Sequence, residues 1–148
     1  YQGRHYRLEP GLRFYPKPVQ DPLPIWGGGS TPRGLRRAAK VADGWIHSYF
    51  TFEEYAEKKA RLTGYLEAEG RDPSRFTFGH HTRLFFYDEP YPDAPPGVGT
   101  AVKIADDIKR WEELGVQHLE LAPPPGPTTE VVLEQLYRFA DEVLAKVA

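Results

Sequence analysis

The stretch PIWGGGSTPRGLRRAAKVADGW, residues 24–45, decides the fold. It opens with Pro24-Ile25-Trp26, a short apolar run before three glycines that is typical of a strand buried on both faces. Thr31 can then cap a helix whose first residue is a proline, where the missing N–H costs nothing. The run Trp45-Ile46-His47 predicts a second strand. Between them, one helical apolar stripe with i, i+3, i+4, i+7 spacing is formed by Leu35, Ala38, Ala39 and Ala42.

The same alternation continues to the end of the chain. Thr51 and Glu54 form a capping box that opens a second helix, which we expect to extend to about Gly70. Further strands are predicted over residues 76–87 and 118–122, and further helices over residues 100–114 and from about residue 129. The connection over residues 88–99 is rich in Pro, Asp and Gly, and its length indicates a functional or mobile loop. The final helix carries apolar residues at core spacing, namely Val132, Leu133, Leu136, Phe139, Ala140, Val143 and Leu144.

Strands that alternate with helices in this way predict parallel β/α units. A complete (β/α)8 barrel usually needs more than about 200 residues, whereas this chain has 148. We therefore predict a single α/β domain over residues 1–148. It has an irregular, proline-rich lead-in over residues 1–23 and four β/α units over residues 24–148, which make either a small open sheet or half of a barrel.

The composition argues against several classes of function. The formal net charge is −2, from 19 Lys and Arg against 21 Asp and Glu, which gives no electrostatic reason to expect nucleic acid or a membrane surface as partner. There is no cysteine, and no apolar run approaches the roughly 20 residues of a membrane span. We therefore expect a cytoplasmic protein that acts on a small molecule. Because the chain also lacks methionine, we expect it to be a fragment or a processed form.

Several short motifs occur in an order that resembles one known family. They are Gly3-Arg4-His5-Tyr6, Pro16-Lys17-Pro18-Val19-Gln20, Pro24-Ile25-Trp26-Gly27-Gly28-Gly29-Ser30, Arg36-Arg37-Ala38-Ala39, Ala42-Asp43-Gly44-Trp45 and Glu69-Gly70-Arg71-Asp72-Pro73. Together they are similar to the bacterial luciferase-like superfamily of flavin- or deazaflavin-dependent oxidoreductases, which are built on a (β/α)8 barrel. The resemblance covers nearly the whole chain, but it matches only the C-terminal half of the family, strands five to eight.

This resemblance implies an activity and a cofactor. The implied reaction is monooxygenation, in which reduced FMN activates O2 and one oxygen atom enters a small organic substrate. The alternative on the same fold is hydride transfer dependent on coenzyme F420. Since the missing half supplies much of the family's pocket, we expect this chain to be inactive alone. We also expect it to associate with that N-terminal half or with a second copy.

Two rival hypotheses belong to other classes. One is a non-catalytic half-barrel that binds flavin or self-associates through its open strand edges. The other is a small flavodoxin-like open sheet that holds a phosphate at its glycine turn. Helices on both faces of the sheet would support the flavodoxin-like hypothesis, and helices on one face would oppose it.

The glycine-rich turn is the candidate cofactor site. It lies at the carboxyl end of a predicted strand, where (β/α)8 barrels bind ligands, and it leads into a helix N-terminus that favours an anion. Glycines also allow a backbone to approach a flat ring or a phosphate. The resemblance implies cofactor contacts at Gly27, Gly28, Gly29 and Ser30. The alternative is a tight strand-to-helix turn that needs a positive φ.

Histidines supply further candidates at the ends of the strands. His47 and Ser48 end the second predicted strand and are possible substrate or cofactor contacts. His80 and His81 are adjacent in the third strand, so alternation points them to opposite faces and argues against a shared metal ion. We predict no metal site. Glu120, in the last strand, is a possible inward-facing carboxylate, and no residue is assigned as catalytic.

Overall fold

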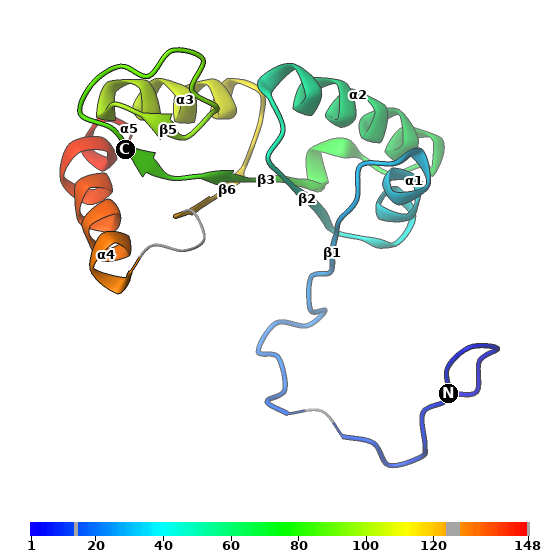
Figure 1. The fold of residues 1–148 in the computed structure, drawn as a ribbon. Coiled ribbons are helices and arrows are strands. Elements are labelled where there is room, and N and C mark those ends of the chain that lie inside the picture. The colour runs from blue at the N-terminus through cyan, green and yellow to red at the C-terminus, as the bar shows by residue number, and fades with distance from the viewer. Residues whose placement is uncertain (14, 124–127, 148) are drawn as a thin grey trace.

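Four parallel strands, one from each predicted β/α unit, form the sheet at the centre of the structure (Figure 1). The structure is a computed structural model that describes residues 1–13, 15–123 and 128–147. The order β1-β2-β3-β6 follows the chain without reversal, as in a barrel and unlike a doubly wound sheet. The strands are β1 Trp26–Gly27, β2 Gly44–Ser48, β3 Thr77–Arg83 and β6 His118–Ala122.

Each strand is followed by a helix, which confirms the predicted β/α pattern. The helices are α1 Pro32–Val41, α2 Phe52–Ala68, α3 Ala101–Glu113 and α4 Thr129–Arg138, and α4 continues through a π-helical turn, η2 Phe139–Leu144, into α5 Ala145–Val147. A short 3-10 turn, η1 Pro73–Arg75, leads into β3.

Threonine side chains fix the starts of the first three helices. The Thr31 hydroxyl accepts the Gly34 N–H at 3.1 Å, and the Thr100 hydroxyl accepts the Lys103 N–H at 3.4 Å. Thr51 and Glu54 form the predicted reciprocal capping box, with N···O distances of 2.9 and 3.2 Å. These caps satisfy backbone N–H groups that have no partner inside the helix, so the short sequence signals define where each helix begins.

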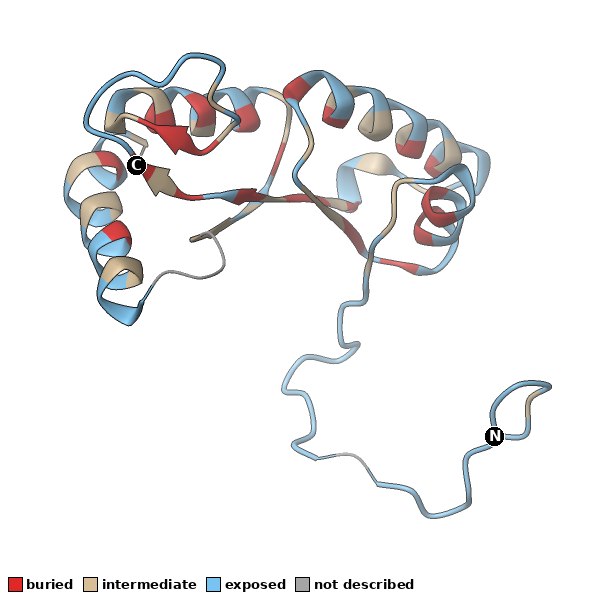
Figure 2. Ribbon diagram, in the orientation of Figure 1, coloured by how far each residue is buried: buried red, intermediate tan, exposed pale blue. Residues whose placement is uncertain are grey.

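The helices cover one face of the sheet and leave the other face open. On the covered face, Trp45 and Phe78 are buried with the apolar sides of α1 and α2 in one core cluster. A second cluster, which includes Leu84, Ile104 and Val143, lies between β4, α3 and η2. Figure 2 shows buried residues along the strands and the inward sides of the helices, while the lead-in is exposed. Helices on one face favour the half-barrel and contradict the flavodoxin-like alternative.

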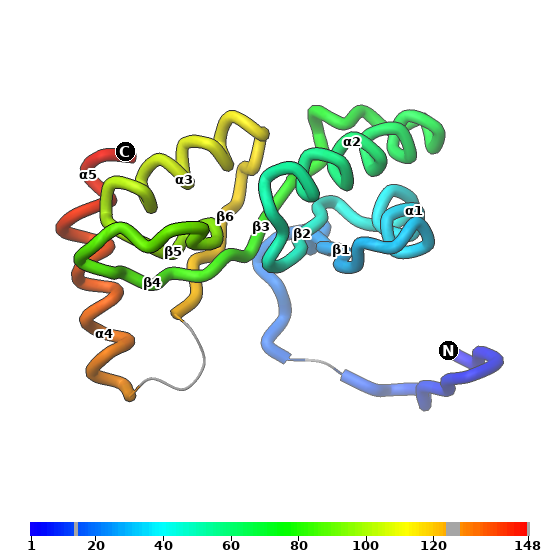
Figure 3. The backbone as a smooth tube through the Cα atoms, turned by 45° about the horizontal axis from the view of Figure 1, so that its top comes forward, coloured from blue at the N-terminus to red at the C-terminus, as the bar shows by residue number. Residues whose placement is uncertain are grey.

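The prediction of one continuous strand over residues 76–87 was wrong, because the strand is interrupted. β3 ends at Arg83, and the chain then leaves β6 to form β4 Phe85–Phe86, which pairs in parallel with β5 Val98–Gly99 (Figure 3). Leu84, between the two strands, is fully buried in the second core cluster. The predicted long loop, residues 88–99, therefore ends in one strand, β5, of a second small sheet.

Two burial predictions were also wrong. The run Pro24-Ile25-Trp26 is not buried on both faces, because β1 is an edge strand with an open face, and Ile25 is 59% exposed. In the final helix only part of the predicted apolar set faces the core. Val143 is buried, whereas the outward-facing members are Leu133, Leu136, Ala140 and Leu144.

Candidate functional site

The carboxyl ends of the four strands and the open face of the sheet form the candidate site. Alternation along the strands gives this face Ile46, Ser48, His81, Arg83, His118 and Glu120. The indole of Trp26 lies across it, since Cβ atoms at Gly44 and Gly79 would meet the indole at 3.0 and 2.8 Å. Two glycines in neighbouring strands thus make room for one aromatic ring, whose edge meets His118 at a centroid distance of 5.1 Å.

The three glycines of the turn have three different environments. A Cβ on Gly27 would lie 2.9 Å from the Ala38 Cβ, so this glycine allows α1 to pack closely on β1. Gly29 has φ +95°, a conformation that favours glycine, and its carbonyl accepts the indole N–H of Trp45 at 3.0 Å. The alternative interpretation, a tight strand-to-helix turn that needs a positive φ, therefore explains Gly29. Close packing of α1 on β1 explains Gly27.

Gly28 has neither constraint. It is exposed, and the nearest atom to an added Cβ is the Ile46 carbonyl oxygen at 3.8 Å, an ordinary contact. Ser30 follows it half-buried at the entrance to α1, whose first turn contains no acidic residue. The N-terminal end of a helix carries partial positive charge, so an anion beside Gly28 and Ser30 would meet no competing carboxylate from that turn.

The structure places His47 and Ser48 on opposite faces of β2. The His47 ring stacks on Phe50 with a centroid distance of 4.3 Å and an interplanar angle of 9°, on the side covered by helices. Its Nδ1 lies 3.1 Å from the Ser48 carbonyl oxygen. Ser48 is in register with His81 and shares the open face with it. Ser48 is therefore the member of this predicted pair that lies beside the other polar groups of the open face.

His80 and His81 also face opposite sides, as predicted. His80 is fully buried, with its ring centroid 4.1 Å from that of Trp111, and neither ring nitrogen has a hydrogen-bond partner among the described residues. Burial, together with the charges of neighbouring His47 and His81, lowers the pKa of His80 to about 4. His80 is thus a neutral core residue at physiological pH.

His81 contacts a carboxylate and a phenol that sequence reasoning did not bring together. Its Nδ1 lies 3.3 Å from Glu120 Oε2, and its Nε2 lies 3.5 Å from the Tyr49 hydroxyl. The second carboxylate oxygen of Glu120 is 3.6 Å from His118 Nε2. Within the described residues, no group of three His, Cys, Asp or Glu side chains is arranged to hold a metal ion. Tyr49 was missed because it follows the predicted strand, and only its positive φ of 61° distinguishes it.

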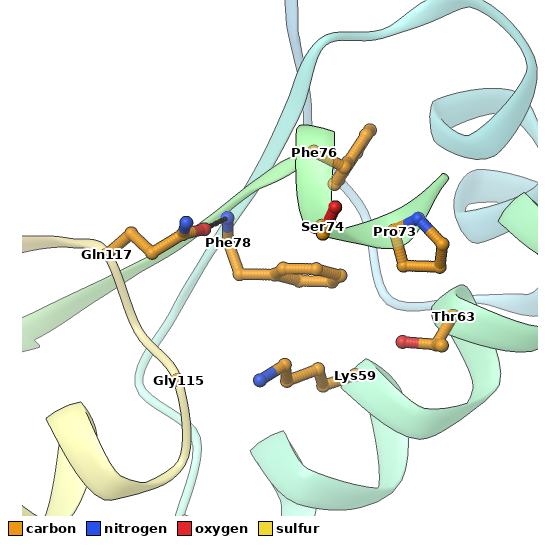
Figure 4. A pocket seen from close by; sticks show the side chains of 8 residues that line it. All are labelled: Lys59, Thr63, Pro73, Ser74, Phe76, Phe78, Gly115 and Gln117. Atoms are coloured by element: carbon orange, nitrogen blue, oxygen red, sulfur yellow. Dashed lines mark hydrogen bonds between the residues drawn. The ribbon is translucent and has the colours of Figure 1, made fainter. Parts of the chain in front are cut away.

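A pocket of about 370 Å³ lies at the opposite, amino ends of the strands (Figure 4). Lys59 extends toward Gly115 there, and its ammonium donates to the Leu114 carbonyl at 2.6 Å. Burial lowers the pKa of Lys59. The Gln117 side-chain oxygen accepts the Phe78 N–H at 3.0 Å in the same pocket. These groups secure the C-terminal end of α3 and the start of β3, and ligands of (β/α)8 barrels bind at the other end.

The fold and the site together define a class: half of a (β/α)8 barrel with a glycine-rich turn and a polar open face at the end where such barrels bind ligands. The sequence model of the luciferase-like monooxygenase family matches residues 1–94, more than half of the chain. The chain therefore belongs to the luciferase-like monooxygenase family. No curated protein sequence matches it. In the described part of the chain, no helix has the length and apolar character needed to cross a membrane.

Solved structures show the same fold at low sequence identity. An F420-dependent secondary alcohol dehydrogenase in complex with an F420-acetone adduct is 16% identical with a TM-score of 0.70, and the match covers 100% of this chain and 55% of that one. The monooxygenase RslO1 from Streptomyces bottropensis is also 16% identical with a TM-score of 0.70, and the match again covers 100% of this chain and 55% of that one. DmoA from Hyphomicrobium sulfonivorans is 16% identical with a TM-score of 0.68, covering 99% of this chain and 46% of that one. The chain thus spans about half the length of the structures it matches.

Proposed function

We propose that this chain forms part of a flavin-dependent oxidoreductase that monooxygenates a small organic substrate with reduced FMN and O2. Family membership supports the reaction class. In this proposal the turn Gly27, Gly28, Gly29 and Ser30 contacts the cofactor, and the open face beside it receives the substrate. FMN, when bound, would supply the redox chemistry, while the protein residues bind, orient and exclude water.

The observation that carries the proposal is the bare backbone at Gly28. Packing accounts for Gly27 and the positive φ accounts for Gly29, whereas a Gly28 Cβ would make only one ordinary contact, with the Ile46 carbonyl oxygen at 3.8 Å. A flat ring or a phosphate approaching the turn would occupy the space beside Gly28. The proposed cofactor phosphate fits here because the adjoining first turn of α1 contributes no carboxylate.

Titrating the chain with FMN and with F420, followed by cofactor fluorescence, tests this site. We expect Gly28→Leu to weaken binding of the preferred cofactor at least tenfold, about 1.4 kcal/mol, because the new side chain fills the space that the cofactor needs. The thermal midpoint should stay nearly unchanged, since position 28 is exposed and a Cβ there makes only an ordinary contact in the free chain.

Two control variants separate cofactor contact from folding. Lys40→Leu adds a comparable apolar side chain at an exposed position on α1, the helix that follows the turn, and should not change binding. Gly27→Ala should lower the thermal midpoint, because its Cβ crowds Ala38. Unchanged affinity in Gly28→Leu would place the cofactor elsewhere.

An F420-dependent hydride-transfer reaction is the second candidate. The contact chain of Glu120, His81 and Tyr49 favours it, because oxidation of an alcohol needs a group that removes the hydroxyl proton. The same fluorescence titration separates the two cofactors, since tighter binding of F420 than of FMN would select this candidate.

We also propose that the chain requires a second polypeptide surface for turnover. It spans about half the length of the structures it matches, and its open sheet face carries the candidate site. One face of α4 and η2 is apolar and exposed, formed by Leu133, Leu136, Tyr137 and Leu144, which are 44%, 44%, 67% and 49% exposed. Such a stripe is suited to association with a second copy or with the other barrel half.

Sedimentation analysis of the isolated chain tests self-association. We expect a concentration-dependent dimer, and Leu136→Arg should weaken it at least tenfold by placing a charge in the apolar stripe. Val41→Arg, which alters an exposed aliphatic residue on α1 (60% exposed, against 44% for Leu136), is the control and should leave the dimer intact. If the chain is a monomer at all concentrations, a second copy is excluded as the partner, and the other barrel half is the surface that turnover requires.

A further inference from the structure

We infer that Tyr49, His81 and Glu120 form a proton relay on the open face, in which the Tyr49 hydroxyl exchanges a proton with an oxygen atom of the substrate. The inference rests on the proposed function for the position of the substrate at the carboxyl ends of the strands. The contacts among the three side chains define the path along which the proton moves.

The His81 ring lies between an obligate acceptor and a hydroxyl. Its Nδ1 is 3.3 Å from Glu120 Oε2, and its Nε2 is 3.5 Å from the Tyr49 hydroxyl oxygen. An ionised carboxylate can only accept, so the contact with Glu120 favours the tautomer with the proton on Nδ1. The Nε2 lone pair is then free to accept the Tyr49 O–H. One tautomer therefore satisfies both contacts.

Glu120 is held by strand pairing and by a second histidine. His81 and Glu120 are direct register partners in the parallel strands β3 and β6. The other oxygen of Glu120 lies 3.6 Å from His118 Nε2, so the carboxylate is positioned between two imidazoles. A carboxylate in this position stabilises the imidazolium that forms when His81 accepts a proton, as in catalytic triads.

The backbone at Tyr49 adopts an unusual conformation that presents its side chain to His81. Its φ is 61°, which is unfavourable for a bulky residue and is found mainly where the surrounding structure enforces it, often at functional sites. The Tyr49 N–H donates to the His81 carbonyl at 3.0 Å, and the two rings meet edge to face at 5.2 Å. The Arg83 guanidinium lies over the same ring, 5.1 Å from the Tyr49 ring centroid.

The relay works in both directions of an alcohol–carbonyl interconversion, for which the cofactor of the proposed function, F420 or a flavin, would accept or supply the hydride. When a substrate oxyanion forms while His81 is the imidazolium, the Tyr49 O–H bond breaks and the proton passes to that oxyanion. The phenolate then takes a proton from His81 Nε2, which leaves neutral His81 with its proton on Nδ1. In the reverse direction a substrate hydroxyl gives its proton to the phenolate after Tyr49 has given its own proton to His81. Tyr49 is the catalytic residue in this scheme, and His81 and Glu120 are positioning residues that act through it. The substrate class is therefore a compound with a hydroxyl or carbonyl group.

Acetylation by N-acetylimidazole tests the relay without either cofactor. In this reaction the Tyr49 O–H bond breaks and its proton goes to His81 Nε2, while the phenolic oxygen bonds to the acetyl carbon and the acetyl C–N bond of the reagent breaks. The leaving imidazole takes up a proton from the His81 imidazolium or from water. Tyr91 is the internal standard, because it is 55% exposed against 56% for Tyr49 and packs against Tyr87 instead of a histidine. Peptide mass spectrometry should show Tyr49 acetylated at least about tenfold faster than Tyr91, since general-base assistance is worth that much or more.

Substitutions assign the acceleration to the relay. His81→Gln should reduce the Tyr49 rate to that of Tyr91, and Glu120→Gln, at a half-exposed position, should reduce it by about threefold or more. Equal rates for Tyr49 and Tyr91 would overturn the inference. The inference would also be overturned if the faster acetylation of Tyr49 persisted in His81→Gln and disappeared in Arg83→Gln. The Arg83 guanidinium alone would then account for the acceleration.

Nitrogen-15 NMR of the histidine rings gives an independent readout of the same contacts. We expect His81 to carry its proton on Nδ1 in the wild-type chain and to lose that preference in Glu120→Gln. A proton on Nε2 in the wild-type chain would overturn the inference. Neither experiment contains FMN or F420, so the relay is tested independently of the cofactor site. The relay can be absent while a cofactor binds at Gly28, and it can be present while no cofactor binds.

Discussion

Replacing His80 with phenylalanine is expected to make the chain more resistant to unfolding by acid. His80 has no exposed surface, and its ring packs between Trp111 and Tyr55 at centroid distances of 4.1 and 5.4 Å. No described residue forms a hydrogen bond with either ring nitrogen. Protonation would therefore create an uncompensated charge in the core, close to the imidazoles of His47 and His81.

The sign of the pH dependence follows from the lowered pKa. Burial lowers the pKa of His80 from 6.5 to about 4, so between these values the unfolded chain binds a proton that the native chain does not. The free energy of unfolding consequently falls as the pH drops from about 6.5 to about 4. With 1.36 kcal/mol for each pKa unit, the loss is about 3 kcal/mol. Phenylalanine does not titrate, so His80→Phe removes this loss.

Urea unfolding at pH 7, 5.5 and 4.5 measures the effect. The difference in unfolding free energy between His80→Phe and wild type should grow in favour of the variant by about 2 to 3 kcal/mol over this range. Carboxylates titrate in both proteins and cancel in the difference. His5→Gln, at an exposed position in the lead-in, should show no such trend. Parallel pH profiles for His80→Phe and wild type would contradict the neutral, buried state of His80.

Signals within a few residues were enough to predict the helices and their starts. Thr31 and Thr51 cap helices as predicted, because a hydroxyl and the backbone N–H it accepts are three residues apart in the chain. Thr100 caps the helix predicted to begin there in the same way. The last strand, His118–Ala122, has the predicted bounds because its apolar alternation lies between turn residues. Alternation also placed His80 and His81 on opposite faces.

Features that depend on contacts distant in the chain were not predicted. The pairing of His81 with Glu120 follows from the register between β3 and β6, which neither strand specifies alone. The interruption at Leu84 arises because that side chain joins a core formed by α3 and η2. Leu133 and Leu136 have the spacing of a buried stripe, yet nothing in the described chain covers them, so their exposure could not be read from periodicity.

Removing the Asp107 carboxylate is expected to release the segment that borders the site. One oxygen of this buried residue accepts the Gly97 N–H at 2.8 Å and the Lys103 ammonium at 2.7 Å. Gly97 has φ +77°, and a Cβ there would collide with the Arg83 carbonyl oxygen, so the backbone needs glycine at this position. Pro95 and Pro96, just before it, line a recess of about 90 Å³ together with side chains that include Tyr49 and Arg83.

We expect Asp107→Ala to lower the free energy of unfolding by about 3 kcal/mol, since a buried N–H loses a charged acceptor and Lys103 loses its partner. Urea unfolding measures this loss, and hydrogen exchange should show faster exchange at Val98 and Gly99, the residues of β5. Asp106→Ala, which alters the adjacent exposed carboxylate on α3, is the matched control and should change stability by less than about 0.5 kcal/mol. Equal effects of the two substitutions would show that the carboxylate does not anchor this segment. A loss confined to Asp107→Ala would establish that α3 holds the border of the site in place through a single buried charge.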